Sequence, residues 1–251
     1  MIVAVFALAL TAGAFAQTEA DFEFGLTEDG TGIVITKYVG KVAAVRIPAT
    51  IQGMPVREIG NGAFGFNGII TSVVIPEGIT KIHSEAFGYT SKLASVTLPE
   101  SLTYLGYAAF FRSAITSLIL PKALTDFGSI VFEQCSNLKT VTLTEGLTKI
   151  PNGIFSYCTA LTTINLPNSV TTIGEGAFSG CTALTTINLP DSVTTIEGSA
   201  FYGCTALTTI TIPESVETIR ISSNAFVNCP RLNLATQAAL KRLGYTGRFT
   251  N

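Results

Sequence analysis

The chain has 251 residues, of which 47% are hydrophobic and 13% are charged, and its formal net charge at pH 7 is -2. Charged residues usually make up about a quarter of a globular protein, so this chain has ample apolar surface to bury and no basic stripe. These values argue against a nucleic-acid partner, which needs clustered Lys and Arg, and against association steered by charge.

Residues 1–16 are uncharged and almost wholly apolar, and they end in Ala14-Phe15-Ala16, a small-x-small pattern that signal peptidase accepts. We therefore expect a signal peptide at 1–16, a mature protein beginning at Gln17, and a secreted, periplasmic or loosely surface-associated product. A short hydrophobic strand or anchor is the alternative. No later stretch reaches the roughly 18 apolar residues of a membrane helix, so no span is expected after removal of the signal.

Residues 17–41 are expected to form an N-terminal cap. Two apolar segments at 22–24 and 33–35 flank the turn-rich residues 28–32, an arrangement typical of a β-hairpin. A stacked repeat protein needs such a cap because the core face of its first unit would otherwise meet water.

Residues 42–232 contain one motif repeated about eight times, mostly at intervals of 23 residues. A proline closes an apolar segment in most copies, and a phenylalanine usually follows it eleven residues later. The phenylalanines are Phe64, Phe87, Phe110, Phe132, Phe155, Phe178, Phe201 and Phe226. Repetition at a period of this length is the signature of a solenoid.

One unit shows how the motif builds such a fold. Ile164 and Leu166 alternate with Thr163 and Asn165, which is the period of a half-buried strand. Pro167 then ends the strand, because proline has no N–H for a ladder bond. A unit this short cannot bury its own apolar face, so units stacked in register must share one continuous core.

The repeated unit, AFxxCxxLxxIxLPxSVTxIG, resembles the BspA-like leucine-rich repeat over about residues 42–232. The segment IPATIQGMPVREIGNGAF, residues 47–64, is similar to the long first repeat of that family. The resemblance implies a mostly β leucine-rich repeat solenoid of about eight 23-residue units. It also implies a bacterial surface or secreted protein that adheres to host matrix proteins or to other cells.

Residues 233–251 are expected to form the C-terminal cap. Residues 234–243 place Leu234, Ala238 and either Leu240 or Lys241 at helical spacing, and Gly244 follows as a stop. We predict a short capping helix; a helix that binds a partner is the alternative.

Five cysteines each lie three residues after the phenylalanine of their unit: Cys135, Cys158, Cys181, Cys204 and Cys229. Stacked units place neighbouring cysteines about 5 Å apart, with their side chains pointing the same way into the core. We interpret them as a ladder of buried thiols, and disulfides between neighbours are the alternative. A linear ladder cannot supply the four tetrahedral ligands of a zinc site.

No catalytic, cofactor-binding or metal-binding residues are predicted, and the chain is not expected to be an enzyme. It contains no Gly-rich phosphate loop, no G-x-S-x-G elbow and no H-E-x-x-H motif. Its single histidine, His83, occupies a slot that we interpret as a solvent-facing turn, because other units tolerate different residues there. Those residues are Gly106, Gly128, Pro151, Gly174 and Glu197.

The residue after each strand-closing position forms a mostly acidic rim along the stack. Its members are Glu77, Glu100, Lys122, Glu145, Asn168, Asp191 and Glu214. We interpret them as solvated turn residues, several of which cap the next backbone segment. A weak edge for cations or basic partners is the alternative, although calcium needs about six to eight converging oxygens and the rim offers one per unit.

The strand positions between the buried ones form the candidate binding surface, here called the strand face. Its residues are Ala44, Arg46, Ser72, Val74, Ser95, Thr97, Ser117, Ile119, Thr140, Thr142, Thr163, Asn165, Thr186, Asn188, Thr209 and Thr211. Eight strands at about 4.8 Å span roughly 40 Å, and solenoids commonly bind through such faces. A threonine ladder also suits a sheet for structural reasons. Exposed Val74 and Ile119 make the first four units the expected place for a ligand.

We therefore expect an exported, adhesin-like module that binds extracellular or host proteins, or other cells, through the strand face. The alternative is a structural or assembly module of the cell envelope that binds itself or a neighbouring envelope protein.

Overall fold

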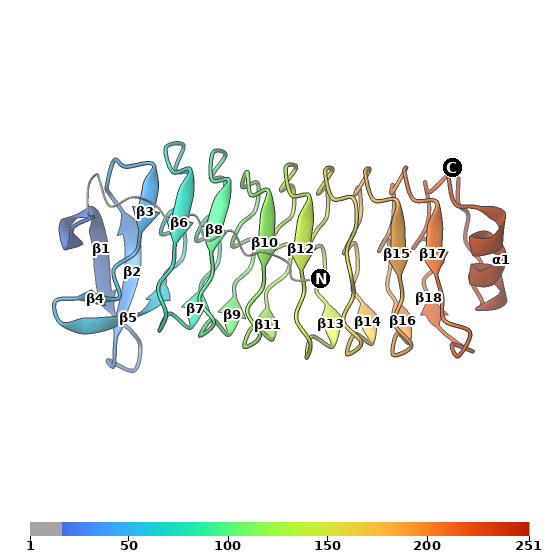
Figure 1. Cartoon of the computed structure of the whole chain (residues 1–251), viewed down its shortest axis with the longest axis horizontal. Helices are drawn as coiled ribbons and strands as arrows, with labels where there is room; N and C mark the ends of the chain where they lie inside the picture. The colour runs from blue at the N-terminus through green and yellow to red at the C-terminus, as the bar shows by residue number, and fades with distance from the viewer. Residues whose placement is uncertain (1–16, 251) are drawn as a thin grey trace, which may run out of the picture.

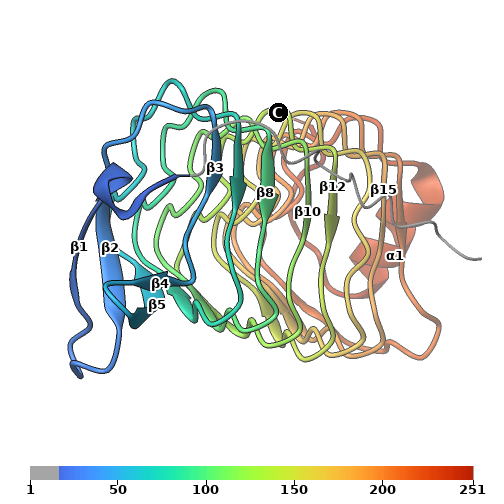
Figure 2. The same cartoon turned by 60° about the vertical axis from the view of Figure 1, so that its left-hand side comes forward.

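The computed structural model describes residues 17–250, so the expected signal peptide lies outside the described residues. The described chain is an elongated solenoid with a β-rich cap at one end and helix α1 at the other (Figure 1). Successive turns of the chain stack as similar loops, which Figure 2 shows from the side. The predicted fold class, a mostly β leucine-rich repeat solenoid, is confirmed.

One row of short strands runs along the stack and corresponds to the apolar segment before each proline (Figure 1). The row consists of β3 (Ala44–Arg46), β6 (Ser72–Val74), β8 (Ser95–Thr97), β10 (Ser117–Ile119), β12 (Thr140–Thr142), β15 (Thr186–Asn188) and β17 (Thr209–Thr211). The strands pair in parallel within the groups β3–β6–β8, β10–β12 and β15–β17, with equivalent residues of successive units side by side, as in Val45↔Val73↔Val96. The unit between β12 and β15 joins the row through bridges of Asn165 to Thr142 and Asn188.

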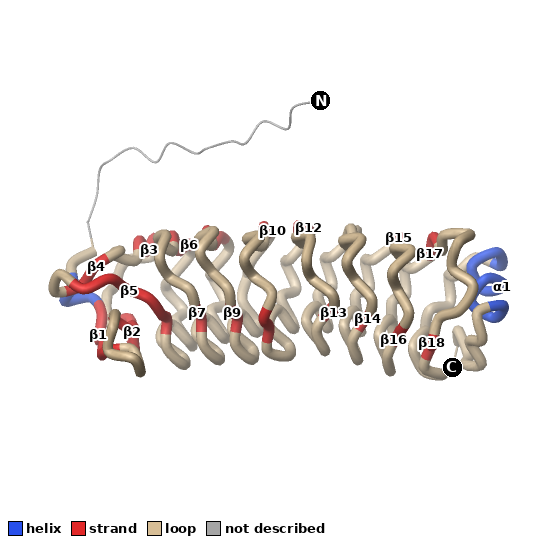
Figure 3. The backbone as a smooth tube through the Cα atoms, turned by 90° about the horizontal axis from the view of Figure 1, so that it is seen from below, coloured by secondary structure: helices blue, strands red, loops and turns tan. Residues whose placement is uncertain are grey.

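A second row of strands lies along another side of the solenoid. It consists of β5 (Met54–Ile59), β7 (Lys81–Ile82), β9 (Tyr104–Leu105), β11 (Asp126–Phe127), β13 (Lys149–Ile150), β14 (Thr172–Ile173), β16 (Thr195–Ile196) and β18 (Arg220–Ile221). Most of these strands have only two residues, so loops make up most of each turn (Figure 3). The second residue of a two-residue strand is usually buried, as Ile82 and Ile173 are.

The core phenylalanines lie on a third side of the solenoid, in a series of turns. Backbone hydrogen bonds also join these turns from one unit to the next. The N–H of Phe87 donates to the carbonyl of Ala109 at 2.8 Å, and the N–H of Phe155 donates to the carbonyl of Ala177 at 3.0 Å. Hydrogen bonds between units therefore run along three sides of the solenoid, which satisfies much of the backbone of these short repeats.

All eight predicted core phenylalanines are fully buried and stack in one column. Centroids of successive rings are 4.8–5.8 Å apart and successive ring planes differ by 4–20°. This spacing is in the range of favourable aromatic pairs. The column runs from the first unit to the last, so it is the continuous core that the repeats require.

The five cysteines are free and buried beside this column, which confirms the predicted thiol ladder. Each thiol donates a hydrogen bond to the carbonyl of the phenylalanine in the preceding unit, with sulfur–oxygen distances of 3.0–3.2 Å. Burial raises the pKa of Cys135, Cys181 and Cys229 well above the ordinary thiol value, to about 12. The thiols are therefore held in their neutral form.

The N-terminal cap contains the predicted hairpin. A short 3-10 helix, η1 (Glu19–Asp21), precedes β1 (Phe22–Leu26), which pairs antiparallel with β2 (Ile33–Tyr38). Strand β2 also pairs in parallel with β5. Strand β4 (Thr50–Ile51) pairs antiparallel with β5. The rings of Tyr38 and Phe64 stack at 5.4 Å, so the cap closes the first end of the aromatic column.

The C-terminal helix is also confirmed, as α1 (Leu234–Arg242); of the residues placed at helical spacing, Leu240 is buried, whereas Leu234 and Ala238 are exposed. Leu234 is 82% exposed, and the buried residues within the helix are Thr236 and Leu240. The reason is the open edge of the last strand. The hydroxyl of Thr236 accepts a hydrogen bond from the N–H of Ile210 at 3.3 Å, which orients that side of α1 toward the stack.

The residues after α1, which lie within the cap expected at residues 233–251, also pack on the last turn of the solenoid. The ring of Tyr245 meets Phe226 edge-on at 5.4 Å, and Phe249 packs on Tyr245 at 5.1 Å. The carbonyl of Phe249 also accepts the N–H of Cys229 at 2.8 Å. No helix in the part of the chain that the structure describes is long and apolar enough to cross a membrane.

Candidate binding surfaces

The strand face extends along the whole first row, and its residues project from the sheet as the alternation predicts. Most are exposed, and the central residue of each strand is buried. Ser72, Val74 and Thr209 are less exposed than the other members and are half-buried. Arg46 is the only charged member, so the surface is polar and almost uncharged.

The predicted exposure of Val74 is wrong, whereas that of Ile119 is correct. Val74 lies in the middle of a three-stranded sheet, between Arg46 and Thr97 in register, and these neighbours flank it on both sides. Ile119 lies in the separate pair β10–β12, next to the break between β8 and β10, and is 72% exposed. The apolar part of the strand face is therefore centred on Ile119.

Gln17 protects the outer edge of this row. Its amide nitrogen donates to the carbonyl of Ala44 at 2.9 Å, and its amide oxygen accepts the N–H of Arg46 at 2.7 Å. An unpaired strand edge invites another strand to bind. The side chain of Gln17 occupies the groups that such a strand would use, so the face itself is the more accessible surface.

The acidic rim contains residues that cap the next unit, as interpreted from the sequence. The carboxylate of Glu77 accepts the N–H groups of Glu100 at 2.9 Å and Ser101 at 3.2 Å. The carboxylate of Asp191 accepts the hydroxyl of Ser215 at 2.7 Å. Among residues 17–250, no three His, Cys, Asp or Glu residues group closely enough to hold a metal ion.

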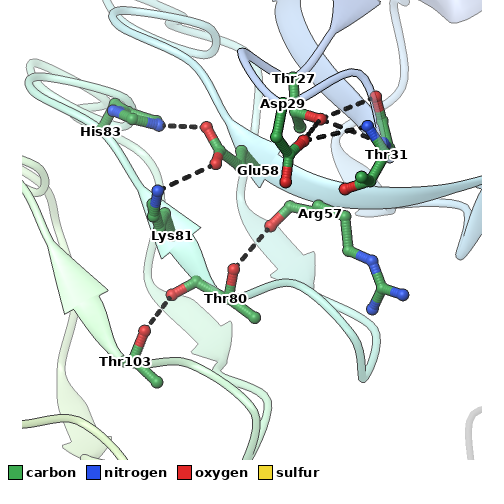
Figure 4. A network of polar contacts seen from close by, with 10 residues as sticks. Thr27, Asp29, Thr31, Arg57, Glu58, Thr80, Lys81, His83 and Thr103 are labelled. Atoms are coloured by element: carbon green, nitrogen blue, oxygen red, sulfur yellow. Dashed lines mark hydrogen bonds and ion pairs between the residues drawn. The ribbon is translucent and has the colours of Figure 1, made fainter.

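His83 belongs to a small ionic cluster near the N-terminal cap (Figure 4). Its Nε2 atom lies 2.7 Å from Oε2 of Glu58, and Nζ of Lys81 lies 3.3 Å from Oε1 of the same carboxylate. Beside this cluster, the hydroxyl of Thr80 donates a hydrogen bond to the backbone carbonyl of Arg57 in the preceding unit, at 3.4 Å. We interpret the cluster as a set of polar contacts that joins two successive units.

The slot of His83 is not the tolerant, solvent-facing turn that the sequence suggested. Gly106 and Gly174 are buried in the same slot. A Cβ atom on Gly106 would lie 2.6 Å from the backbone of His83, which is closer than real Cβ contacts. Successive turns pack directly on each other here, and glycine is needed where the neighbouring backbone is close.

A further surface, which the sequence analysis missed, arises at the position two residues after each core phenylalanine. Here this position is called the left-handed slot, because its φ angle is +55° to +70° in all eight units. Its occupants are Phe66, Tyr89, Arg112, Gln134, Tyr157, Gly180, Gly203 and Asn228. Glycine and asparagine suit this conformation. For the five bulkier residues it costs about 1–2 kcal/mol each.

Side chains of the first three units form what we call the aromatic strip: Phe66, Tyr89 and Arg112 from the left-handed slot, and Phe111 from the position before Arg112. The rings of Phe66 and Tyr89 stack at 4.3 Å, and Phe111 meets Tyr89 edge-on at 5.1 Å. The guanidinium of Arg112 lies 5.7 Å from the Tyr89 ring and 5.2 Å from the Phe111 ring, within the range of cation–π contacts. Phe66 is 72% exposed.

The aromatic strip leads into a surface hollow of about 580 Å³. Its lining consists of Ser91, Arg112, Ser113, Ala114, Gln134, Ser136, Asn137, Tyr157 and Thr159. Arg112 connects the two features, because its Nε atom donates to the amide oxygen of Gln134 at 2.7 Å. Tyr157 is half exposed, and its ring covers Gly180, where a Cβ atom would lie 2.7 Å from the ring.

One signal in the sequence points to this surface. Aligning the units on their phenylalanines shows large side chains in the left-handed slot of the first five units, and Gly180, Gly203 and Asn228 in the last three. The strand face was favoured instead because alternation identifies outward strand residues directly, whereas nothing in the motif shows which way a turn residue points.

Comparisons with known proteins agree with this architecture. Residues 57–184 and 148–244 match the family described as BspA type leucine rich repeat region (6 copies). A search of curated proteins found no match. Among solved structures, the T. pallidum leucine-rich repeat protein TpLRR is 31% identical, with a TM-score of 0.70, over 93% of this chain and 98% of that protein.

Two further solved structures show the same fold at lower identity. A leucine-rich repeat protein from Bacteroides ovatus is 24% identical, with a TM-score of 0.57, over 87% of this chain and 70% of that one. A leucine-rich repeat protein from Eubacterium ventriosum is 22% identical, with a TM-score of 0.54, over 80% of this chain and 51% of that one. With its repeats and its stacked core on the same pattern, the chain belongs to the BspA-type leucine-rich repeat family.

Proposed function

We propose that the chain is an exported, adhesin-like recognition module that binds an extracellular protein, from host matrix or another cell, through the strand face. The observation that carries this proposal is the extent of that face. It runs along the whole first row, is largely exposed and carries one charged residue. Membership of a leucine-rich repeat family supports a role in protein binding.

The chemistry of the strand face suits binding to a protein. Its threonine, serine and asparagine side chains are short, so little side-chain entropy is lost when a partner immobilises them. Ile119 adds an exposed apolar contact among these polar groups. The interface centres of protein complexes are depleted of charge, as this face is. Export rests on the apolar residues 1–16 and their Ala14-Phe15-Ala16 ending.

The test is retention of residues 17–251 on immobilised fibronectin, laminin and collagen, compared with the variant Ile119→Lys. Lysine at an exposed strand position should change stability by no more than about 0.5 kcal/mol, but its charge must be desolvated in any interface. We expect binding to at least one matrix protein, loss of that binding in Ile119→Lys, and little change in the rim variant Glu145→Gln.

Salt provides a second readout of the same experiment. Screening acts on charges, so binding through the nearly uncharged strand face should persist from low to physiological ionic strength. Full binding by folded Ile119→Lys would exclude this part of the face, and steep salt sensitivity would favour the acidic rim. Self-association without matrix binding, measured by sedimentation velocity, would favour an assembly module of the envelope instead.

A further inference from the structure

The large side chains of the left-handed slot contribute little that the fold itself requires. The slot N–H of Tyr157 donates to the carbonyl of Ser179 at 2.6 Å, and that of Gly180 donates to the carbonyl of Tyr202 at 2.7 Å. The bond between units is thus the same with tyrosine or glycine. Phe66 and Tyr157 are exposed by 72% and 50%, so their rings serve the surface more than the core.

The hollow beside these rings has the chemistry of a carbohydrate site. Tyr157 offers one exposed ring, and hydroxyl, amide and guanidinium groups surround it on Ser136, Asn137, Gln134 and Arg112. A sugar ring presents apolar C–H groups on its faces and hydroxyls at its rim, so it can stack on an aromatic ring and pair with polar groups at once. An apolar peptide would leave the same polar groups unpaired, which is costly when they are desolvated.

The lining of the hollow is mostly polar and uncharged. It contains Arg112 and no carboxylate. The guanidinium of Arg112 is held by neutral groups, because its Nε atom donates to the amide oxygen of Gln134 at 2.7 Å and it lies against the rings of Tyr89 and Phe111. Uncharged donors and acceptors therefore make up most of the lining, which suits the hydroxyls of a sugar.

We infer that the hollow and the aromatic strip together bind a neutral oligosaccharide. One sugar stacks on Tyr157 inside the hollow, and the chain extends over Arg112 and Phe111 toward Tyr89 and Phe66. Units of the solenoid repeat at about 4.8 Å, close to the length of one pyranose in a β-linked chain, so successive sugars meet successive units. The site uses none of the strand-face residues and goes beyond the proposed function.

The test is saturation-transfer NMR on residues 17–251 with cellotetraose, triacetylchitotriose and lactose at millimolar concentration. We expect transfer to at least one of these sugars and an affinity reduced by about tenfold in Tyr157→Gly, the size of the loss expected for one aromatic stacking contact. Tyr157→Gly should remain folded, because glycine occupies the same slot at Gly180 and Gly203.

Two control variants make the result specific. Tyr107 is 49% exposed but lies outside the strip and the hollow, so Tyr107→Ala should bind sugar like the parent. Ile119→Lys should also bind sugar normally, which separates this site from the strand face. The inference is overturned if none of the three sugars shows transfer, or if Tyr157→Gly binds as tightly as the parent. Loss of matrix-protein binding in Tyr157→Gly, without any sugar binding, would assign the hollow to a protein.

Discussion

At the scale of residues, the position three after each core phenylalanine shows how the repeat satisfies its buried polar groups. In the last five units a thiol donates to the carbonyl of the core phenylalanine in the preceding unit. In earlier units Thr90 donates to the carbonyl of Phe87 at 2.6 Å, and Ser113 shares a hydrogen bond with Cys135 at 3.2 Å. The slot thus selects a small donor, which explains why cysteine recurs there without forming disulfides.

These thiols predict a specific loss of stability at high pH. Burial raises the pKa of Cys135, Cys181 and Cys229 to about 12 in the folded chain, whereas the unfolded chain releases these protons near pH 8.5. Their full contribution is therefore present below about pH 8.5 and is lost progressively as the pH rises toward 12. Each pKa unit corresponds to about 1.4 kcal/mol per thiol.

Urea unfolding at about pH 7 and about pH 10 measures this loss. The matched control replaces Cys135, Cys181 and Cys229 with serine, which Ser113 shows to be compatible with the slot. The two proteins differ only at these three positions, so a difference in their pH dependence is due to the three thiols. The parent should lose more free energy of unfolding between the two pH values than the triple variant; equal losses would show that the buried thiols titrate normally.

At the scale of elements, the sequence predicts what depends on the period of the motif and misses what depends on distant neighbours. Alternation around Ile164 identified the strand row and its buried side correctly. Helical spacing alone identified the buried Leu240 of α1 but missed Thr236, whose hydroxyl accepts the N–H of Ile210 at the end of the stack. The aromatic strip was missed because the outward direction of its side chains depends on left-handed backbone turns. A tyrosine such as Tyr89 does not indicate a left-handed turn in the sequence.

The close packing of turns in the His83 slot gives a prediction for glycine. Gly174→Ala places a Cβ atom 2.6 Å from the carbonyl oxygen of Ile150 and 2.5 Å from Oδ1 of Asn152. The backbones must move apart, and such overpacking typically costs about 1–3 kcal/mol. Gly68→Ala is the matched control, since a Cβ atom at Gly68 meets nothing within 4 Å. Denaturant unfolding should show a loss for Gly174→Ala alone; two equal effects would mean that the slot can expand.

At the scale of the whole molecule, the solenoid is one column of aromatic rings closed at both ends. Tyr38 stacks on the first ring, Phe64, and Tyr245 meets the last ring, Phe226. Each turn bonds mainly to its neighbours, so the free energy of unfolding depends on the interfaces between adjacent units, as in other repeat proteins. A rigid column also holds the exposed side chains of successive units in register, which both proposed binding surfaces require.

The most direct test of this account is the stability of Phe155→Ala, in the middle of the column. The ring is fully buried between Phe132 and Phe178, with centroids 5.8 and 5.7 Å away. Its removal should lower the free energy of unfolding by about 3–5 kcal/mol, measured in urea, and Phe155→Leu should lower it by less. Tyr107→Ala, which removes a half-exposed ring outside the column, should change it by no more than about 0.5 kcal/mol. A free energy of unfolding that Phe155→Ala leaves unchanged would contradict a continuous aromatic core.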